Sequence, residues 1–365
     1  GESQRGKIDR GPLSNFIDRK ESEYMKRYNV AILGATGAVG EQMIRVLWER
    51  RFPIGGLRLL SSERSAGGRM DTPFGNAELG LACETAFEGA DIVLGAAEND
   101  IARRFAPAIR AAGAVFVDNS SAFRMDPDVP LVVPEINPDD ALKHNGIISN
   151  PNCSTIICLT ALYPLIKAGV KIEKAVISSY QAVSGAGKNG IRELREQGKG
   201  IFRDDSVFDK PIFGNVIPLI GELSDGESRE EVKMREESEK ILGEKAFKVF
   251  TTCVRVPVER CHSFSITLFL EEEDADEDYF ESLYDEETYS VAEGVLIPRS
   301  VKLLKTNYPT PLECSDKDTV FVGRMRTYKS DSGVLSLWCC GDQLRKGAAS
   351  NAIEIARLWF DGKNR

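Results

Sequence analysis

The chain has 365 residues, more than one hydrophobic core usually supports, and 42% of them are hydrophobic, which suits two ordinary globular domains. Its net charge of −9 gives no electrostatic footprint for nucleic acid, and no run of about 18 apolar residues could span a membrane. The eight cysteines are scattered and form no CxxC pair, which argues against a disulfide scaffold, so we expect reduced thiols and a cytoplasmic protein. The chain has only two histidines, which argues against a metal site.

The N-terminal residues 1–24 are polar, carry both signs of charge and lack the apolar stretch of a signal peptide. Met25 directly precedes Lys26 and Arg27, which lead into the first apolar run, and this suggests that Met25 is the natural start. We therefore expect residues 1–24 to be a tag or a disordered extension.

A glycine-rich turn follows the first expected strand, residues 28–33. Gly34, Gly37 and Gly40 lie between this strand and a segment whose apolar residues, from Val39 to Trp48, recur at helical spacing. This setting allows a pyrophosphate to approach backbone N–H groups at a helix N-terminus, although the spacing is GxxGxxG rather than GxGxxG.

The second expected strand, residues 57–60, ends in a loop that contains both acidic and basic side chains. Glu63 would suit a ribose 2′-hydroxyl, whereas Arg64 flanked by Ser62 and Ser65 would suit a 2′-phosphate. We favour NADP, and a solvated loop without a ligand is the alternative.

Further strands over 91–94 and 114–117, with a helix over 100–112 between them, predict a parallel, doubly wound sheet. Ligands gather at the carboxyl ends of such strands. Arg124 follows one of these ends and could bind an anion there, or be an ordinary loop residue.

Cys153 lies between a short apolar run, residues 146–148, and an apolar segment, residues 155–166, that predicts a helix. A thiol at a helix N-terminus can have a pKa lowered toward neutrality and act as a nucleophile. A buried core cysteine is the alternative, although Asn150, Pro151 and Asn152 favour a tight turn.

The character of the chain changes after Leu159, which predicts a second domain. Apolar alternation in the strand at 262–270 indicates an antiparallel sheet with one buried face, of the kind that often forms a subunit interface. Residues 184–190 predict a flexible glycine loop, residues 192–209 an irregular or helical segment, and the acidic run 271–287 a solvated face. The other expected elements are strands over 171–183, 247–258 and 336–340, a charged helix over 230–242, and a C-terminal helix to Trp359 that returns to the first domain.

His262 is the better candidate base for Cys153, because its apolar neighbours could tune its pKa, whereas His144 lies in a polar turn. Arg255 could hold a substrate carboxylate through two hydrogen bonds.

With these residues assembled, the sequence resembles the bacterial type of aspartate-β-semialdehyde dehydrogenase over nearly the whole chain from Met25 onward. Two departures are Cys261, where glycine usually precedes the histidine, and the run Gly95-Ala96-Ala97-Glu98. The matching segments are GATGAVG (34–40), SSERSAG (61–67), DNSSAFR (118–124), VPEIN (133–137), SNPNCSTI (149–156), YQAVSGAG (180–187), NVIP (215–218), EEVKM (230–234), RVPVERCHS (255–263) and LRKGAASNA (344–352).

The resemblance implies an α/β fold. A doubly wound, Rossmann-type NADP-binding domain would comprise residues 25–157 and 344–365. An α+β catalytic and dimerisation domain with a mostly antiparallel or mixed sheet would comprise residues 158–343. It also implies a homodimer or a dimer of dimers.

The resemblance further implies roles for individual residues. Cys153 would be the nucleophile and His262 the general acid/base, with Asn152 positioning the carbonyl and Gln181 orienting the substrate. Arg255 and Glu230 would hold the carboxylate and amine of the substrate, and Arg124 and Lys233 the phosphate. The implied NADP contacts are Gly34, Thr36, Gly37, Ala38, Val39, Ser62, Arg64, Ser65, Ser184, Gly185, Gly347 and Asn351.

The implied reaction is the reduction of β-aspartyl phosphate to aspartate semialdehyde and phosphate, through a thioester on Cys153, in lysine, threonine and methionine biosynthesis. Two alternatives remain open. One is the related reductase of N-acetylglutamyl phosphate, and the other is a nucleotide-binding paralogue without activity.

Overall fold

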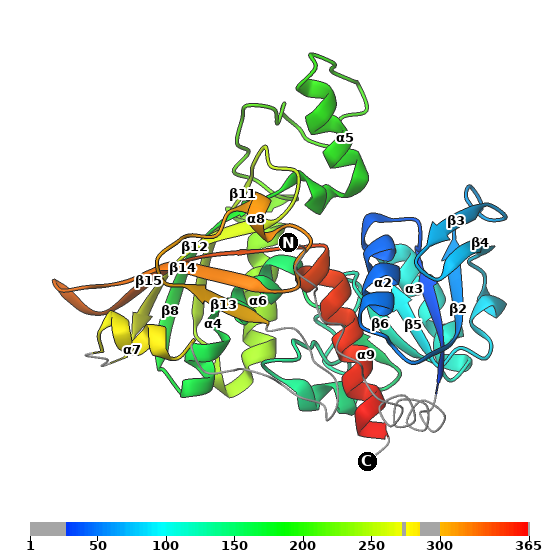
Figure 1. Cartoon of the computed structure of the whole chain (residues 1–365), viewed down its shortest axis with the longest axis horizontal. Coiled ribbons are helices and arrows are strands. Elements are labelled where there is room, and N and C mark those ends of the chain that lie inside the picture. Colours follow the sequence, from blue (N-terminus) through cyan, green and yellow to red (C-terminus); the bar gives the residue numbers. More distant parts are fainter. Residues whose placement is uncertain (1–26, 272–274, 285–299, 364–365) are drawn as a thin grey trace, which may run out of the picture.

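The structure, a computed structural model, describes residues 27–271, 275–284 and 300–363. The expected N-terminal extension and part of the acidic run therefore lie outside the described residues. Figure 1 shows two domains side by side, with the C-terminal helix α9 (Ser350–Lys363) on the side of the first domain that faces the second.

The first domain is built on a sheet with seven strands among the described residues, in the order β3-β4-β2-β1-β5-β6-β7. All neighbouring strands run parallel except β3 and β4. The strands are β1 (Tyr28–Leu33), β2 (Ile54–Ser61), β3 (Arg69–Thr72), β4 (Gly75–Leu81), β5 (Ile92–Gly95), β6 (Val115–Asp118) and β7 (Ile147–Ser149).

Helices cover both faces of this sheet, which explains why its central strands are continuous apolar runs. Apolar residues of α2 (Ala38–Glu49) and α9 pack on one face, and those of α3 (Asn99–Ala111) pack on the other. Two short helical turns, η1 (Glu84–Phe87) and η2 (Pro138–Lys143), complete the domain. The predicted doubly wound domain is confirmed.

The second domain is built on a mixed sheet, as predicted, with six strands in the described part of the chain and the order β11-β8-β12-β15-β14-β13. The two edge pairs, β11 with β8 and β13 with β14, are parallel, and the inner pairs are antiparallel. The strands are β8 (Ile172–Gln181), β11 (Lys248–Arg255), β12 (His262–Leu270), β13 (Val301–Leu304), β14 (Val320–Tyr328) and β15 (Asp331–Gly341).

One face of the second sheet packs on α4 (Cys153–Ala168) and α6 (Arg229–Leu242) around a large apolar core. The opposite face exposes Val176, Tyr180 and Phe250 on β8 and β11. Smaller elements are η3 (Val183–Ala186), α5 (Gly187–Gln197), β9 (Leu223–Ser224), β10 (Glu227–Ser228), η4 (Gly243–Lys245), α7 (Glu277–Ser282) and α8 (Pro311–Cys314).

Two features of the second domain differ from the sequence-based expectation. The predicted glycine loop 184–190 is instead η3 followed by the start of α5, because its glycines allow close packing. A Cβ on Gly190 would lie 2.3 Å from the carbonyl oxygen of Val183. The predicted domain boundary between residues 157 and 158 falls inside α4, and most apolar residues of this helix from Ile156 onward belong to the second core.

A short π-helical segment, η5 (Arg345–Ala349), connects the second sheet to α9 and contacts α2, α4 and α9. Within it, Lys346 is 1% exposed and pairs with Glu135 at 2.6 Å and with Glu354 at 2.7 Å. Burial lowers the pKa of Lys346, but the two carboxylates outweigh burial and raise this pKa above its usual value. This cluster fixes the segment that joins the two domains.

Replacing Lys346 by Met should lower the free energy of unfolding by about 3–5 kcal/mol, because the buried carboxylate of Glu135 would lose its cation and Glu354 would keep only its pair with Arg50 at 3.1 Å. Lys143→Met provides the control, since Lys143 forms an exposed pair with Asp140. The control should unfold like the parent in urea. Equal unfolding midpoints for both variants would contradict a structural role for the Lys346 cluster.

Candidate active site

Cys153 is the first residue of α4, at the carboxyl side of β7, as predicted. Asn152 caps the helix, since its side-chain oxygen accepts hydrogen bonds from the N–H groups of Ser154 at 2.8 Å and Thr155 at 3.4 Å. The π segment lies directly against the cysteine, because a Cβ on Gly347 would be 3.0 Å from that of Cys153. A π-helical turn of this kind often occurs at functional sites.

The expectation of a thiol pKa lowered toward neutrality is wrong. Burial, followed by the nearby carboxylate of Glu230, raises the pKa of Cys153 to about 11. Arg124, Arg255 and Lys233 act in the opposite direction and lower this pKa. Four of the predicted substrate-binding residues therefore lie close enough to the thiol for their charges to affect it.

His262 begins β12 and is completely buried. Its Nδ1 accepts a hydrogen bond from the Ala182 N–H at 3.1 Å, whereas Nε2 has no partner among the described residues. Burial, followed by the charge of Arg255, lowers the pKa of His262 to about 3. Protonation would also turn Nδ1 into a donor facing the Ala182 N–H, so the neutral ring is favoured.

Arg124 is held from three directions. Its Nε donates to the Asn150 carbonyl at 3.0 Å, and its Nη2 donates to the Asn119 carbonyl at 2.6 Å. Its Nη1 donates to Oε1 of Glu237 at 2.9 Å, and Oε2 of Glu237 accepts the backbone N–H of Asn152 at 2.6 Å. Arg124 is thereby tied to the turn that carries Cys153.

Helix α6 supplies a row of charged side chains to the site. Oε1 of Glu230 accepts the side-chain N–H of Asn152 at 2.8 Å, and its Oε2 accepts Nζ of Lys233 at 3.3 Å. Sequence reasoning identified these two residues but missed Glu237 and Lys240. The sequence does contain a signal for Glu237 and Lys240. Together with Glu230 and Lys233 they are spaced by three, four and three residues, so all four share one face of the helix.

Arg255 and Gln181 come from the ends of two neighbouring parallel strands, β11 and β8, and are directly paired in register. The Arg255 Nη1 donates to the Ala182 carbonyl at 2.6 Å, and the Gln181 side chain donates to Oγ of Ser179 at 3.2 Å. Both side chains are buried. A Cβ on Gly185 would lie 2.7 Å from Nη1 of Arg255, so a side chain at this position would displace the guanidinium.

The glycine-rich turn lies where the chain leaves β1, beside the end of β5. Gly34 has φ +88, and a Cβ there would be 2.6 Å from the Ala96 carbonyl oxygen. Gly37 is the N-cap of α2 and offers no side chain to cap it. The turn, with Thr36 within it and Ala38 and Val39 in the first turn of α2, therefore leaves N–H groups suited to a pyrophosphate.

The remaining predicted cofactor residues lie at three places. Ser62, Arg64 and Ser65 form a turn after β2, in which Ser65 N–H donates to the Ser62 carbonyl at 2.9 Å, and Arg64 is exposed. Ser184 Oγ accepts a hydrogen bond from the Gln343 side chain.

The last of these residues, Asn351, is buried behind the cysteine turn. Its side chain donates to Oδ1 of Asn150 at 2.7 Å and to the Val132 carbonyl at 3.1 Å. These contacts tie α9 to the turn that precedes Cys153.

Cys261 adopts the left-handed region of backbone space, with φ +75. Few residues other than glycine adopt this region, which explains why glycine suits the position before His262. The Gln343 side-chain oxygen accepts the Cys261 N–H at 2.8 Å and so supports this conformation.

In the part of the chain that the structure describes, no cluster of histidine, cysteine and acidic side chains is arranged to bind a metal ion. Likewise, none of the described helices is long and apolar enough to cross a membrane.

Family models match both domains. The model described as semialdehyde dehydrogenase, NAD binding domain, matches residues 29–144, and the one described as semialdehyde dehydrogenase, dimerisation domain, matches residues 162–346. The first domain is therefore an NAD(P)-binding domain.

Curated relatives are similar over their full length. The aspartate-semialdehyde dehydrogenase of a Synechocystis species is 40% identical and is aligned over 90% of this chain and 96% of its own. That of Aquifex aeolicus is 43% identical over 91% of this chain and 97% of its own.

Solved structures agree. An aspartate semialdehyde dehydrogenase II from Vibrio cholerae, complexed with ASA, has a TM-score of 0.85 and 37% identity, covering 92% of this chain and 99% of its own. A probable aspartate-semialdehyde dehydrogenase from Pseudomonas aeruginosa has a TM-score of 0.82 and 28% identity, with the same coverage of both chains. Sequence, fold and site geometry agree, and the chain belongs to the aspartate-semialdehyde dehydrogenase family.

Proposed function

We propose that the chain reduces β-aspartyl phosphate to aspartate semialdehyde and phosphate with NADPH, using Cys153 as the nucleophile. The observation that carries this proposal is the thiol of Cys153 at the start of α4. Its pKa is lowered by three nearby cations, Arg124, Arg255 and Lys233, and raised by one carboxylate, that of Glu230. Such a set of charges suits a substrate with a phosphate, a carboxylate and an amine. His262, with Nε2 unpaired among the described residues, supplies the acid/base.

The first chemical step is attack of the Cys153 sulfur on the acyl carbon. The carbon–sulfur bond forms, the bond between carbon and the phosphate oxygen breaks, and phosphate leaves a thioester on the enzyme. Neutral His262 accepts the thiol proton in this step. This transfer is needed because the free thiol has a pKa of about 11 and is protonated at neutral pH.

The second step converts the thioester to the aldehyde. The hydride for the acyl carbon would come from NADPH held by the glycine-rich turn at the start of α2. His262 returns its proton to the resulting oxyanion. The backbone N–H of Cys153 would stabilise that oxyanion by about 3 kcal/mol, since the N–H groups of Ser154 and Thr155 are used by the Asn152 cap. In the collapse of the thiohemiacetal, His262 takes the hydroxyl proton, the carbon–sulfur bond breaks to release the aldehyde, and the proton returns to the sulfur of Cys153.

The substrate is held by the charged residues around the thiol. Arg255 binds its carboxylate and Glu230 its amine, while Arg124 and Lys233 bind the phosphate. Asn152 positions the carbonyl and Gln181 orients the substrate. In support, Asn152 and Lys233 both contact Glu230 in the structure.

We further propose NADP as the cofactor. Gly34, Thr36, Gly37, Ala38 and Val39 would receive its pyrophosphate at the start of α2. Ser62, Arg64 and Ser65 would bind the 2′-phosphate, since an exposed arginine in a serine-containing turn suits a dianion. Ser184, Gly185, Gly347 and Asn351 would line or support the nicotinamide end, close to Cys153 and His262.

A homodimer, alone or within a dimer of dimers, would cover the exposed face of the second sheet. Val176, Tyr180 and Phe250 give this face an apolar character. The match of the second domain to a dimerisation domain supports this assembly.

The two alternatives are less well supported. The curated relatives carry the aspartate-semialdehyde name rather than that of an N-acetylglutamyl-phosphate reductase. A binding-only paralogue would be expected to lose its nucleophile or its base, and this chain retains both Cys153 and His262.

We predict that the protein forms NADPH from aspartate semialdehyde only when inorganic phosphate is present, and not from N-acetylglutamate semialdehyde. Absorbance at the NADPH band measures the rate. Cys153→Ser should abolish turnover but retain NADP binding, because a serine hydroxyl is a far weaker nucleophile. Substantial turnover by this variant, or phosphate-independent NADPH formation, would contradict the mechanism.

Arg64→Ala should raise the KM for NADP by about 10- to 100-fold and leave the KM for NAD unchanged, because one charge-assisted interaction with the 2′-phosphate is lost. Arg69→Ala is the control, since exposed Arg69 on the neighbouring β3 bonds to Asn76. If Arg64→Ala changes both KM values alike, Arg64 does not read the 2′-phosphate.

Glu230→Gln should lower the pKa of Cys153 below about 11, because the carboxylate that opposes the thiolate is removed. The rate of iodoacetamide alkylation at Cys153, measured against pH, reports this value. At pH 8 the variant should react faster than the parent. Glu227→Gln, which removes an exposed glutamate paired with Arg235, should have no effect. If the pH midpoint of Cys153 alkylation is unchanged or higher in Glu230→Gln, the Glu230 carboxylate does not raise the pKa of Cys153.

A further inference from the structure

Glu237 is a buried carboxylate with 1% exposure to which the proposed mechanism gives no role. Each of its oxygens accepts one hydrogen bond: Oε1 from the Arg124 guanidinium at 2.9 Å, and Oε2 from the Asn152 N–H at 2.6 Å. One side chain thus joins a proposed phosphate-binding residue to the residue directly before the nucleophile.

The contacts of Arg124 show what this bridge accomplishes. A guanidinium has five N–H donors, and three are used by Asn150, Asn119 and Glu237. Among the described residues, one donor on each terminal nitrogen is left for a ligand. Because the guanidinium is planar and fixed at three points, the direction of the two remaining donors is set by these contacts.

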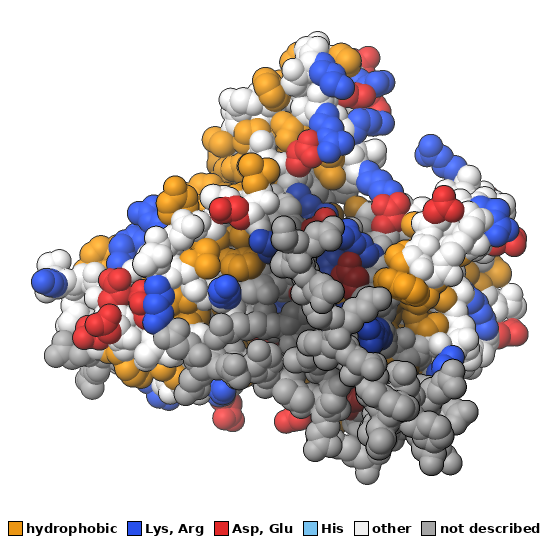
Figure 2. Space-filling view, viewed as in Figure 1, with side chains coloured by type: hydrophobic (Ala, Val, Ile, Leu, Met, Phe, Trp, Pro, Cys, Tyr) orange, Lys and Arg blue, Asp and Glu red, His pale blue; other side chains and the backbone are white. Residues whose placement is uncertain are grey.

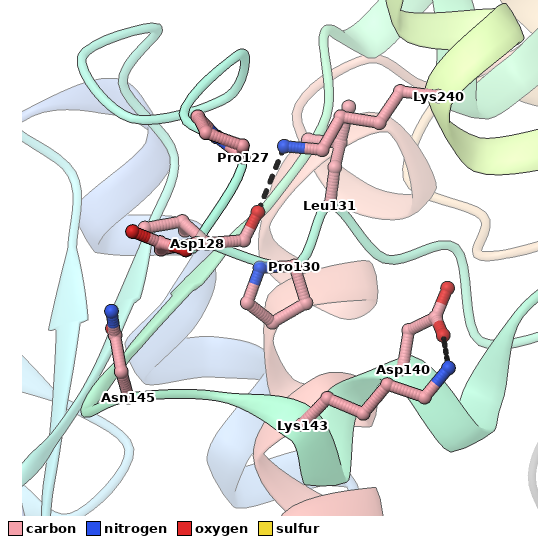
Figure 3. A pocket seen from close by; sticks show the side chains of 9 residues that line it. Pro127, Asp128, Pro130, Leu131, Asp140, Lys143, Asn145 and Lys240 are labelled. Atoms are coloured by element: carbon pink, nitrogen blue, oxygen red, sulfur yellow. Dashed lines mark hydrogen bonds and ion pairs between the residues drawn. The ribbon is translucent and has the colours of Figure 1, made fainter.

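The same helix holds the loop that carries Arg124. Lys240, one turn after Glu237, donates to the carbonyl oxygens of Arg124, Asp126 and Val129 at 2.7, 2.7 and 2.8 Å. Figure 3 shows the Lys240 ammonium reaching from α6 to this loop above Pro130, at the edge of a cavity of about 460 Å³. Lys240 thus anchors the backbone of the loop, while Glu237 anchors the Arg124 side chain.

We propose that Glu237 is a positioning residue that aligns the Arg124 guanidinium with the Cys153 turn and so sets the phosphate subsite. This inference rests on the proposed function, in which Arg124 binds the phosphate. Glu237 itself touches neither substrate nor cofactor and acts through Arg124 and Asn152.

This role makes a prediction opposite to that of simple electrostatics. Removing a negative charge near an anion site should strengthen phosphate binding if charge alone matters. If Glu237 instead orients Arg124, its loss should weaken phosphate binding. Glu237→Gln distinguishes the electrostatic explanation from the positioning explanation. Its amide oxygen can accept one hydrogen bond, but its NH₂ group faces the other donor and cannot accept from it.

The measurement is the KM for phosphate and, separately, the phosphate concentration that half-protects Cys153 from iodoacetamide. We expect both to rise about 10- to 100-fold in Glu237→Gln, with the KM for aspartate semialdehyde unchanged. Glu231→Gln is the matched control. Glu231 is a buried glutamate on the same helix that accepts the N–H groups of Ser228 at 2.7 Å and Cys253 at 2.8 Å, remote from Arg124. The Glu231→Gln variant should be less stable than the parent but have the same KM for phosphate.

Glu237→Asp serves if the glutamine variant does not fold. It keeps the buried charge, but its shorter side chain cannot reach both donors, so its phosphate KM should also rise. If a folded Glu237 variant binds phosphate as tightly as the parent or more tightly, the inference is overturned. It is also overturned if the KM values for phosphate and aspartate semialdehyde rise by the same factor. Arg124→Lys separates the two proposals. If it leaves the phosphate KM unchanged, the proposed role of Arg124 fails. If it raises this KM and the Glu237 variants do not, only the inference about Glu237 fails.

Discussion

The site depends on the hydrogen bonds of Asn152, which connect α4 to α6. Its side-chain oxygen caps the helix that begins at Cys153, its side-chain N–H donates to Glu230, and its backbone N–H donates to Glu237. Because all three groups belong to one residue, the nucleophile cannot move relative to the charged row on α6 without breaking at least one of these hydrogen bonds. The helix N-terminus and the substrate-binding charges are therefore one rigid unit.

Burial and charge oppose each other at this unit. Burial holds the Cys153 thiol protonated and His262 neutral, whereas three cations around the thiol favour its ionised form. Figure 2 shows basic and acidic side chains close together where the two domains meet on this face of the molecule. In the proposed mechanism, a substrate carboxylate bound to Arg255 would offset the charge that lowers the pKa of His262, which favours transfer of the thiol proton to His262.

Local patterns were enough to predict most elements that position the site. The apolar runs of β1, β5 and β6 and the glycine turn before α2 fall within a residue or two of their predicted places. The hairpin β3–β4 was missed, because its strands are largely exposed and their sequences lack clear apolar alternation. Glu237 was missed because a glutamate in a charged helix is usually solvated, and only the packing of α6 against the Arg124 loop makes it buried.

The sequence by itself determined the family, the two-domain α/β fold and the position of Cys153 at a helix start, because these follow from motifs and periodicity that are local in the chain. Only the tertiary structure decided the ionisation of the site. The pKa of Cys153 depends on burial and on Glu230, Arg124, Arg255 and Lys233, which come from distant segments. A helix N-terminus favours a thiolate, but desolvation is a property of the assembled fold and outweighs it here.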